Sequence, residues 1–239
     1  VIVVISKPPA KEVRDEVVAL LQKCTKPVVA IFLGEKPENH EGKVYLAHTL
    51  EETARMAVDL ANGDPIKDNY CDPINYEVSK PLAADKTVKG LYSGGSLAAE
   101  AGMLIAEALN LGGLIKEEGY ILKTGGYEVV DLGDDVYTQG KPHPMIDPEV
   151  RIKKILECAK DPQTGVILLD CMLGYGCHPD MAGALAPAIR EAQEIAKADG
   201  RELYFVASVC GTRQDPQDYD RAVAELKECG VLVEESNAR

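Results

Sequence analysis

Short apolar runs alternate with amphipathic segments along most of the chain. Continuous or nearly continuous apolar runs, which are typical of strands buried on both faces, occupy residues 1–5, 27–33, 166–169 and 203–209. Apolar positions at helical spacing occur at residues 12–24 and 184–198. Strands that alternate with helices predict parallel sheets covered by helices, and therefore an α/β fold.

This alternation occurs in two units separated by a polar connection. We expect a first unit at residues 1–63, a linker at residues 64–88 and a second unit at residues 89–239. The second unit has extra elements in its front half, including a strand at residues 127–132 and a helix near residues 147–159, for which the first unit has no counterpart. We therefore expect the first unit to be the back half of a similar domain, whose front half lies upstream or on another chain. The alternative is a small unit that packs against the second sheet.

A glycine loop joins the first strand and the first helix of the second unit. Residues 93–96 read Ser-Gly-Gly-Ser, and an alanine-rich helix follows at once. Glycines permit a tight turn and let a ligand approach the backbone closely. The unpaired N–H groups and the partial positive charge of a helix N-terminus favour an anion. Ser93, Gly94, Gly95 and Ser96 are therefore candidates for binding phosphate or carboxylate, and a turn without a ligand is the alternative.

Composition and charge limit the range of functions. The 239 residues are 46% apolar, which is enough for a substantial core. The formal net charge of −13 argues against a nucleic-acid partner, because phosphate backbones attract basic surfaces. The absence of a long apolar run argues against a membrane span. Seven dispersed cysteines, an odd number, favour reduced thiols and a cytoplasmic protein.

Ligands of parallel α/β folds bind at the carboxyl ends of the strands, and several polar side chains follow predicted strands of the second unit. These candidates are Asp134, Asp135, His143, His178 and Cys210. The two aspartates supply hard oxygen ligands that suit Mg²⁺ beside a phosphate. His143 lies between two prolines that fix its direction, and a histidine titrates near neutrality. Cys210 is a candidate nucleophile. Solvated turns, loop histidines without a role and a small buried thiol are the alternatives.

The other histidines and cysteines predict no further site. His40 and His48 belong to a polar connection, in which solvated side chains are expected. The spacing of Cys171, Cys177 and His178 fits no common zinc pattern. We therefore expect no metal site that is made by protein ligands alone.

Several stretches of the second unit resemble the α subunit of succinyl-CoA synthetase and its relatives among the acyl-CoA synthetases. They are residues 90–97, 131–135 and 166–176. Within that superfamily, residues 140–148 and 4–9 are similar to the FdrA proteins specifically. The resemblance implies a parallel-sheet, flavodoxin-like second unit that is preceded by the back half of a second similar domain. It also implies a CoA-binding domain upstream.

The same resemblance implies an enzyme that acts on an acyl- or carbamoyl-phosphate-type anion, with CoA and Mg²⁺ as cofactors and a homo- or hetero-oligomeric assembly. In the synthetases, a histidine on the loop after the strand that matches residues 203–209 takes up phosphate. Here that loop contains Arg213 and no histidine, so a covalent phosphohistidine is not expected.

The candidate catalytic residues are therefore His143 and Arg213, since a guanidinium can clamp a carboxylate or a phosphoryl group through two hydrogen bonds. The likeness to FdrA implies, as an alternative, a carbamoyltransferase component that acts on oxamate or oxalurate in allantoin breakdown. A non-catalytic subunit or scaffold is the further alternative, because the histidine is missing from the loop.

Overall fold

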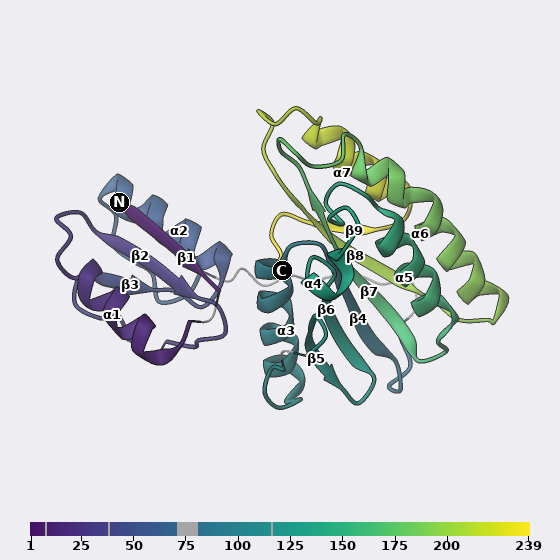
Figure 1. Cartoon of the computed structure of the whole chain (residues 1–239), viewed down its shortest axis with the longest axis horizontal. Coiled ribbons are helices and arrows are strands. Elements are labelled where there is room, and N and C mark those ends of the chain that lie inside the picture. Colours follow the sequence, from purple (N-terminus) through teal and green to yellow (C-terminus); the bar gives the residue numbers. More distant parts are fainter. Residues whose placement is uncertain (8, 38, 71–80, 116) are drawn as a thin grey trace. The chain divides into compact units, whose positions relative to one another are not determined.

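Two compact units make up the chain, Val1–Asn75 and Tyr76–Asn237, and each is described by itself (Figure 1). The structure, a computed structural model, describes residues 1–7, 9–37, 39–70, 81–115 and 117–239. The division falls inside the predicted linker at residues 64–88, of which residues 71–80 lie outside the described residues. That the first unit is the back half of a larger domain stays a prediction.

The second unit is built on one six-stranded sheet. Its strands are β4 (Thr87–Tyr92), β5 (Tyr120–Thr124), β6 (Tyr127–Asp131), β7 (Thr164–Met172), β8 (Tyr204–Cys210) and β9 (Leu232–Glu234). They lie in the order β5-β6-β4-β7-β8-β9, and all neighbours are parallel except the β5–β6 pair. Without β5, this is the 2-1-3-4-5 order of flavodoxin-like folds. The expected α/β fold with a parallel sheet is therefore confirmed.

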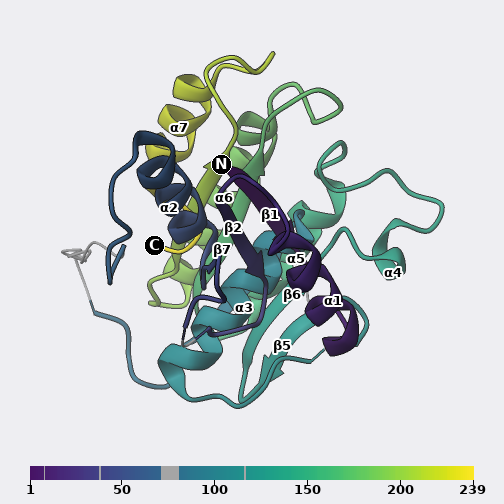
Figure 2. The same ribbon diagram turned by 90° about the vertical axis from the view of Figure 1, so that its left-hand side faces the viewer.

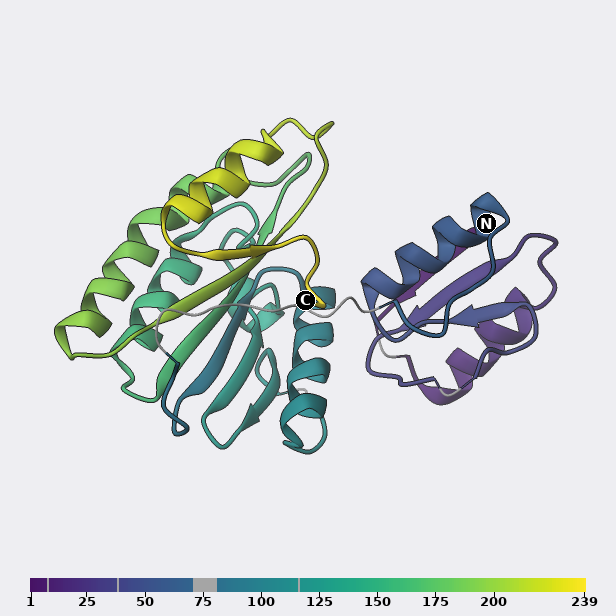
Figure 3. The same ribbon diagram turned by 180° about the vertical axis from the view of Figure 1, so that it is seen from behind.

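Helices cover both faces of this sheet. They are α3 (Gly95–Leu109), α4 (Asp135–Thr138), α5 (Glu149–Lys160), α6 (Met181–Ala198) and α7 (Tyr219–Glu228). Figures 1 and 3 show α3 on one face, with α5, α6 and α7 in a row on the other. The main core lies beneath that row and contains Ile155, Ile167, Ile189 and Phe205, each fully buried. Among the described residues, no helix is both long enough and apolar enough to cross a membrane.

The antiparallel strand β5 was not predicted from the sequence. It forms a hairpin with β6 through Gly125 and Gly126, whose φ angles of +55° and +88° suit glycine. The strand is half exposed, so its residues do not form the apolar run that marked the buried strands. Helix α3 packs closely on β5, because a methyl group on Gly102 would lie 2.8 Å from Ile121 Cγ2.

Two helix starts and one strand start differ from the expected positions. Helix α7 begins at Tyr219 with Asp218 as its N-cap. The sequence predicts a start at Asp215-Pro216, because aspartate is a common N-cap and proline is common at the first helical position. Asp215 instead closes the loop after β8, where its carboxylate accepts from the N–H of Thr212. Helix α6 begins at Met181, which places Pro187 inside the helix. Strand β4 begins at Thr87, two residues before the predicted start of the second unit at residue 89.

The first unit has a three-stranded parallel sheet between two helices. Its elements are β1 (Ile2–Ser6), α1 (Lys11–Leu21), β2 (Val28–Phe32), β3 (Val44–Leu46) and α2 (Leu50–Asn62). The strand order is β1-β2-β3, and Figures 1 to 3 show α1 and α2 on opposite faces. The elements of the first unit follow the order β1, α1, β2, β3, α2, whereas the second unit ends in the order β7, α6, β8, α7, β9. The strand–helix–strand start is therefore shared, but the last strand and the last helix are exchanged.

The start of α2 supplies a stability test. Thr49 is buried, and its hydroxyl accepts a hydrogen bond of 3.0 Å from the N–H of Glu52. The Thr-Leu-Glu-Glu sequence of residues 49–52, which fits a capping box, predicts this bond. We expect Thr49→Ala to lower the free energy of unfolding by about 1 kcal/mol, because the cap of an N-terminal N–H is lost. Urea unfolding followed by circular dichroism measures this change. Thr25→Ala, at an exposed position, is the control, and an equal effect of both changes would contradict the capping role.

Candidate functional site

The strand order places a switch point between β4 and β7. Helix α3 leaves β4 toward one face and α6 leaves β7 toward the other, and ligands of such folds bind in the crevice that results. In this chain, a carboxylate of the chain itself lies at the switch point. Asp170, near the end of β7, is fully buried and accepts hydrogen bonds from Ser93 N at 2.9 Å, Ser93 Oγ at 3.0 Å and Gly94 N at 2.7 Å.

The charge of Asp170 is balanced by a buried arginine. Arg151, on α5, places Nη2 3.0 Å from Asp170 Oδ1 and also donates to the carbonyl oxygen of Asp170 at 2.6 Å. Both side chains are 0% exposed. Within the described part of the chain, Arg151 Nε and Nη1 have no hydrogen-bond partner. The pair therefore connects α5 to the end of β7, but it leaves two buried donors of Arg151 without an acceptor.

This contact changes the picture of the glycine loop. The N–H groups of Ser93 and Gly94 are the first two donors of the predicted anion site, and both already bind the carboxylate of Asp170. Gly95 and Ser96 form the first turn of α3, where N–H groups have no acceptor within the helix, and both are half-buried. An external anion would therefore be held by Gly95 and Ser96, and anion binding at residues 93–96 stays a prediction.

His143 points toward the same edge of the sheet. Its Nδ1 accepts a hydrogen bond of 3.2 Å from Met145 N, which assigns the proton of the neutral ring to Nε2. A methyl group on Gly133 would lie 2.5 Å from His143 Nε2, 3.0 Å from Ser93 O and 3.1 Å from Asp131 Oδ1. The ring therefore lies against Gly133, beside the carboxyl ends of β4 and β6, and only a residue without a side chain leaves it that position.

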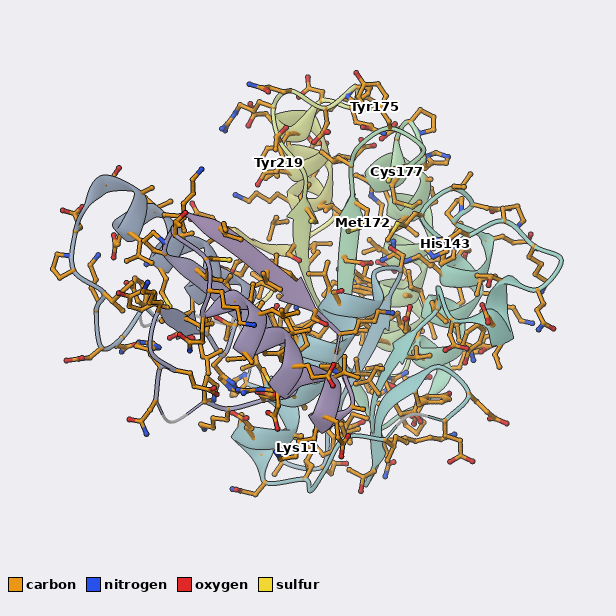
Figure 4. All side chains as sticks on the ribbon, turned by 60° about the vertical axis from the view of Figure 1, so that its left-hand side comes forward. Lys11, His143, Met172, Tyr175, Cys177 and Tyr219 are labelled. Atoms are coloured by element: carbon orange, nitrogen blue, oxygen red, sulfur yellow. The ribbon has the colours of Figure 1, made fainter. Side chains whose placement is uncertain are left out.

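The loop after β7 borders the His143 segment. His178 donates its backbone N–H to the carbonyl oxygen of Met145 at 2.7 Å, and its Nδ1 accepts from Asp180 N at 3.0 Å. The neutral His178 ring therefore also carries its proton on Nε2. Figure 4 labels four residues of this edge, namely His143, Met172, Cys177 and Tyr175. Tyr175 stands at the tip of the loop and is 92% exposed.

Gln217 is a residue of this edge that the sequence did not single out. Its Oε1 accepts from Gly174 N at 2.9 Å, and its Nε2 donates to Gly174 O at 3.0 Å and to His178 O at 3.2 Å. One buried side chain thus joins the loop after β7 to the loop after β8. Arg151 was also missed, although its spacing of four and eight residues from the buried Ile155 and Ala159 marks it as inward-facing.

Arg213 is not brought to the His143 edge. Its guanidinium forms two hydrogen bonds to Asp220, at 2.9 and 2.8 Å, and lies 5.6 Å from the centre of the Tyr219 ring. Arg213 in turn holds the pKa of Asp220 below its usual range. These residues line a hollow of about 730 Å³ beside α7 and β9, whose lining includes neither Ser93 nor His143. That Arg213 binds a ligand held at the N-terminus of α3 stays a prediction. The hydrogen bonds between Arg213 and Asp220 do not favour it.

The acidic loop after β6 is a helix cap. Asp134 Oδ1 accepts from Val136 N at 3.1 Å at the start of α4, while Asp135 is exposed. In the described part of the chain, no three side chains of His, Cys, Asp or Glu are grouped so as to hold a metal ion. One or two carboxylates are the usual protein contribution to Mg²⁺ that arrives with phosphate, so that role of Asp134 and Asp135 stays a prediction.

Comparison with known proteins agrees with the fold of the second unit. Residues 91–239, more than half of the chain, match the CoA-ligase family. The chain belongs to the CoA-ligase family. The chain is also 35% identical, over an alignment of 254 residues, to a curated protein of Escherichia coli (strain K12), the uncharacterized protein YahF. That alignment takes in 99% of the chain and 48% of YahF, so the chain spans about half the length of this relative.

The Asp170–Arg151 pair generates a prediction about stability. We expect Asp170→Asn to lower the free energy of unfolding by about 3–5 kcal/mol, because Arg151 would remain buried without a counter-charge. Urea unfolding measures the change. Asp135→Asn, an exposed carboxylate of the same unit, is the control and should shift the free energy by less than about 0.5 kcal/mol. The double change Asp170→Asn with Arg151→Met should be less harmful than Asp170→Asn alone, because it buries no unpaired charge and keeps an acceptor oxygen for Ser93 and Gly94. Equal stability of Asp170→Asn and the native chain would contradict the role of the pair.

Cys210 lies at the end of β8 and is exposed, not buried. Partial desolvation of its thiol and the nearby charges of Asp170 and Asp215 raise its pKa, so it carries less thiolate at a given pH than an ordinary cysteine, and its role as a nucleophile stays a prediction that this shift does not favour. We expect its alkylation by iodoacetamide near about pH 8 to be slower than that of glutathione, and the rate to keep rising above about pH 8.5. Peptide mapping by mass spectrometry separates Cys210 from the other cysteines. A rate that levels off below about pH 7 would show a lowered pKa and restore the nucleophile hypothesis.

Proposed function

We propose that this CoA-ligase chain is an FdrA-like enzyme component that binds an acyl- or carbamoyl-phosphate-type anion at the N-terminus of α3. The observation that carries the proposal is the placement of His143 Nε2 against Gly133, beside Ser93, at the strand ends where ligands of this fold bind. A helix terminus and an imidazole N–H at one edge are suited to a ligand with negatively charged oxygens.

His143 acts as a hydrogen-bond donor in this proposal. Because Nδ1 accepts the N–H of Met145, the neutral ring offers Nε2–H and has no lone pair for taking up a proton at that atom. Nε2–H would donate to a carbonyl or phosphoryl oxygen of the ligand and stabilise the negative charge that develops there during acyl or carbamoyl transfer. Gly95 and Ser96 would bind the phosphate oxygens through their N–H groups.

The remaining parts of the machinery are proposed on the family relationship. The loop after β8 lacks a histidine, which supports direct transfer without a covalent phosphohistidine. CoA would be bound by another domain, and Mg²⁺ would arrive with the phosphate and contact Asp134 or Asp135. A carbamoyltransferase component acting on oxamate or oxalurate is a finer form of the same proposal. Reduced cysteines support a cytoplasmic protein, and we propose that it works as a homo- or hetero-oligomer.

Two sets of hydrogen bonds within the second unit favour a second function. The N–H groups of Ser93 and Gly94 are bonded to Asp170, and Arg213 is bonded to Asp220. Some of the groups that the sequence predicts for anion binding are thus already bonded to carboxylates of the chain itself. A non-catalytic subunit that keeps the fold while a partner performs the reaction agrees with this arrangement.

Titration calorimetry with acetyl phosphate and carbamoyl phosphate separates the two proposals. We expect both compounds to bind the native chain, and Ser96→Asp to weaken binding at least tenfold because it places a negative charge at the first turn of α3. His143→Phe should weaken binding similarly, because Nε2–H is lost.

Thr124→Asp adds the same charge at an exposed position of β5 and is the matched control. Binding that is unchanged in Ser96→Asp, or no binding to the native chain, would overturn the anion site and leave the scaffold function.

A further inference from the structure

The first unit contains a pocket that the proposed function does not use. It has a volume of about 430 Å³, within the usual range for small-molecule sites. His40 comes from the β2–β3 connection, His48 follows β3 directly, Glu52 belongs to α2, and Lys67 and Asp68 belong to the segment after α2. His40 and His48 follow the carboxyl ends of β2 and β3, where ligands of such sheets bind.

His40 is exposed, as expected for a solvated side chain, and His48 is half-buried, but each ring also forms a hydrogen bond with the backbone. His40 Nδ1 accepts from Leu46 N at 3.1 Å, which assigns the proton of the neutral ring to Nε2. His48 Nδ1 lies 2.8 Å from the carbonyl oxygen of Glu35 and must donate to it, since a carbonyl only accepts. Each ring therefore has a set orientation at the wall of the pocket. His40 Nε2–H is the ring donor for a ligand oxygen.

The floor of the pocket is apolar. Leu46 and Met56 line it and are 5% and 2% exposed, and Ile66 adds a half-buried aliphatic side chain. This surface suits a small branched or linear aliphatic group, because apolar area is removed from water when the ligand binds.

The rim carries charges of both signs. Lys67 places an ammonium group on it, 3.8 Å from the nearest carboxylate oxygen of Asp59, a distance too long for a hydrogen bond. Asp68 and Glu52 supply carboxylates, and Glu52 also accepts from His48 N at 2.6 Å. A ligand with one net charge would meet a like charge on this rim, whereas a ligand with both charges matches it.

We propose that this pocket binds a small aliphatic α-amino acid. The carboxylate of the ligand faces Lys67 and His40 Nε2–H, its ammonium group faces Asp68 and Glu52, and its side chain lies on Leu46, Met56 and Ile66. This site belongs to the first unit and does not depend on the anion site proposed for the second.

A matched set of three probes tests the proposal. L-leucine carries both charges, 4-methylpentanoate lacks the ammonium group, and 3-methylbutylamine lacks the carboxylate. By titration calorimetry on the full chain, we expect saturable binding of L-leucine and at least tenfold weaker binding of the other two. Equal binding of all three, or no binding of L-leucine up to its solubility, would overturn the proposal.

Two variants locate the binding. Lys67→Met should weaken L-leucine at least tenfold, as should Asp68→Asn, since each removes one charge-assisted contact. Lys26→Met, at an exposed position of the same unit, is the matched control and should leave binding unchanged. Circular dichroism confirms that the variants are folded. Binding of L-leucine that is unaffected by both rim variants would place it elsewhere and overturn the proposal.

Discussion

The ion pair between Asp170 and Arg151 is the contact on which the second unit depends. It lies at the switch point of the sheet, where β4 and β7 are neighbours and their helices leave toward opposite faces. Because both groups are fully buried, each must keep its partner to avoid an uncompensated charge in the interior. The carboxylate also accepts hydrogen bonds from the two N–H groups just before α3, so a residue of β7 holds the start of that helix.

That constraint shapes the functional edge. Because Ser93 and Gly94 donate to Asp170, the donors of the α3 terminus that an external ligand can still use are the half-buried Gly95 and Ser96. His143 faces the other side of the same edge across Gly133. Hydrogen bonds and close contacts thus fix the positions of these groups at the strand ends. In proteins that share a fold, the side chains placed on it decide what binds.

The sequence predicted the α/β architecture, but it did not predict that Asp170 binds the N–H groups before α3 or that Arg213 pairs with Asp220. Continuous apolar runs identify β2, β7 and β8 because strands buried on both faces need no alternation. Strand β5 was missed because it is a half-exposed edge strand, and the start of α7 was misplaced because Asp215 caps a loop as readily as a helix. Asp170 looked like an ordinary strand residue, since nothing local shows that Ser93, 77 positions earlier, is its partner.

The two units differ in how their charged groups are placed. In the second unit, a buried carboxylate lies at the switch point of the sheet and is paired with a buried arginine, so these two charges balance each other inside the protein. In the first unit, Lys67, Asp68 and the histidines stand around an apolar floor, with polar groups at the rim of a pocket. Charges at a partly solvated rim cost little desolvation, so they remain able to select a ligand by its charge pattern. Specific recognition therefore follows more directly from the geometry of the first unit, although the family relationship rests on the second.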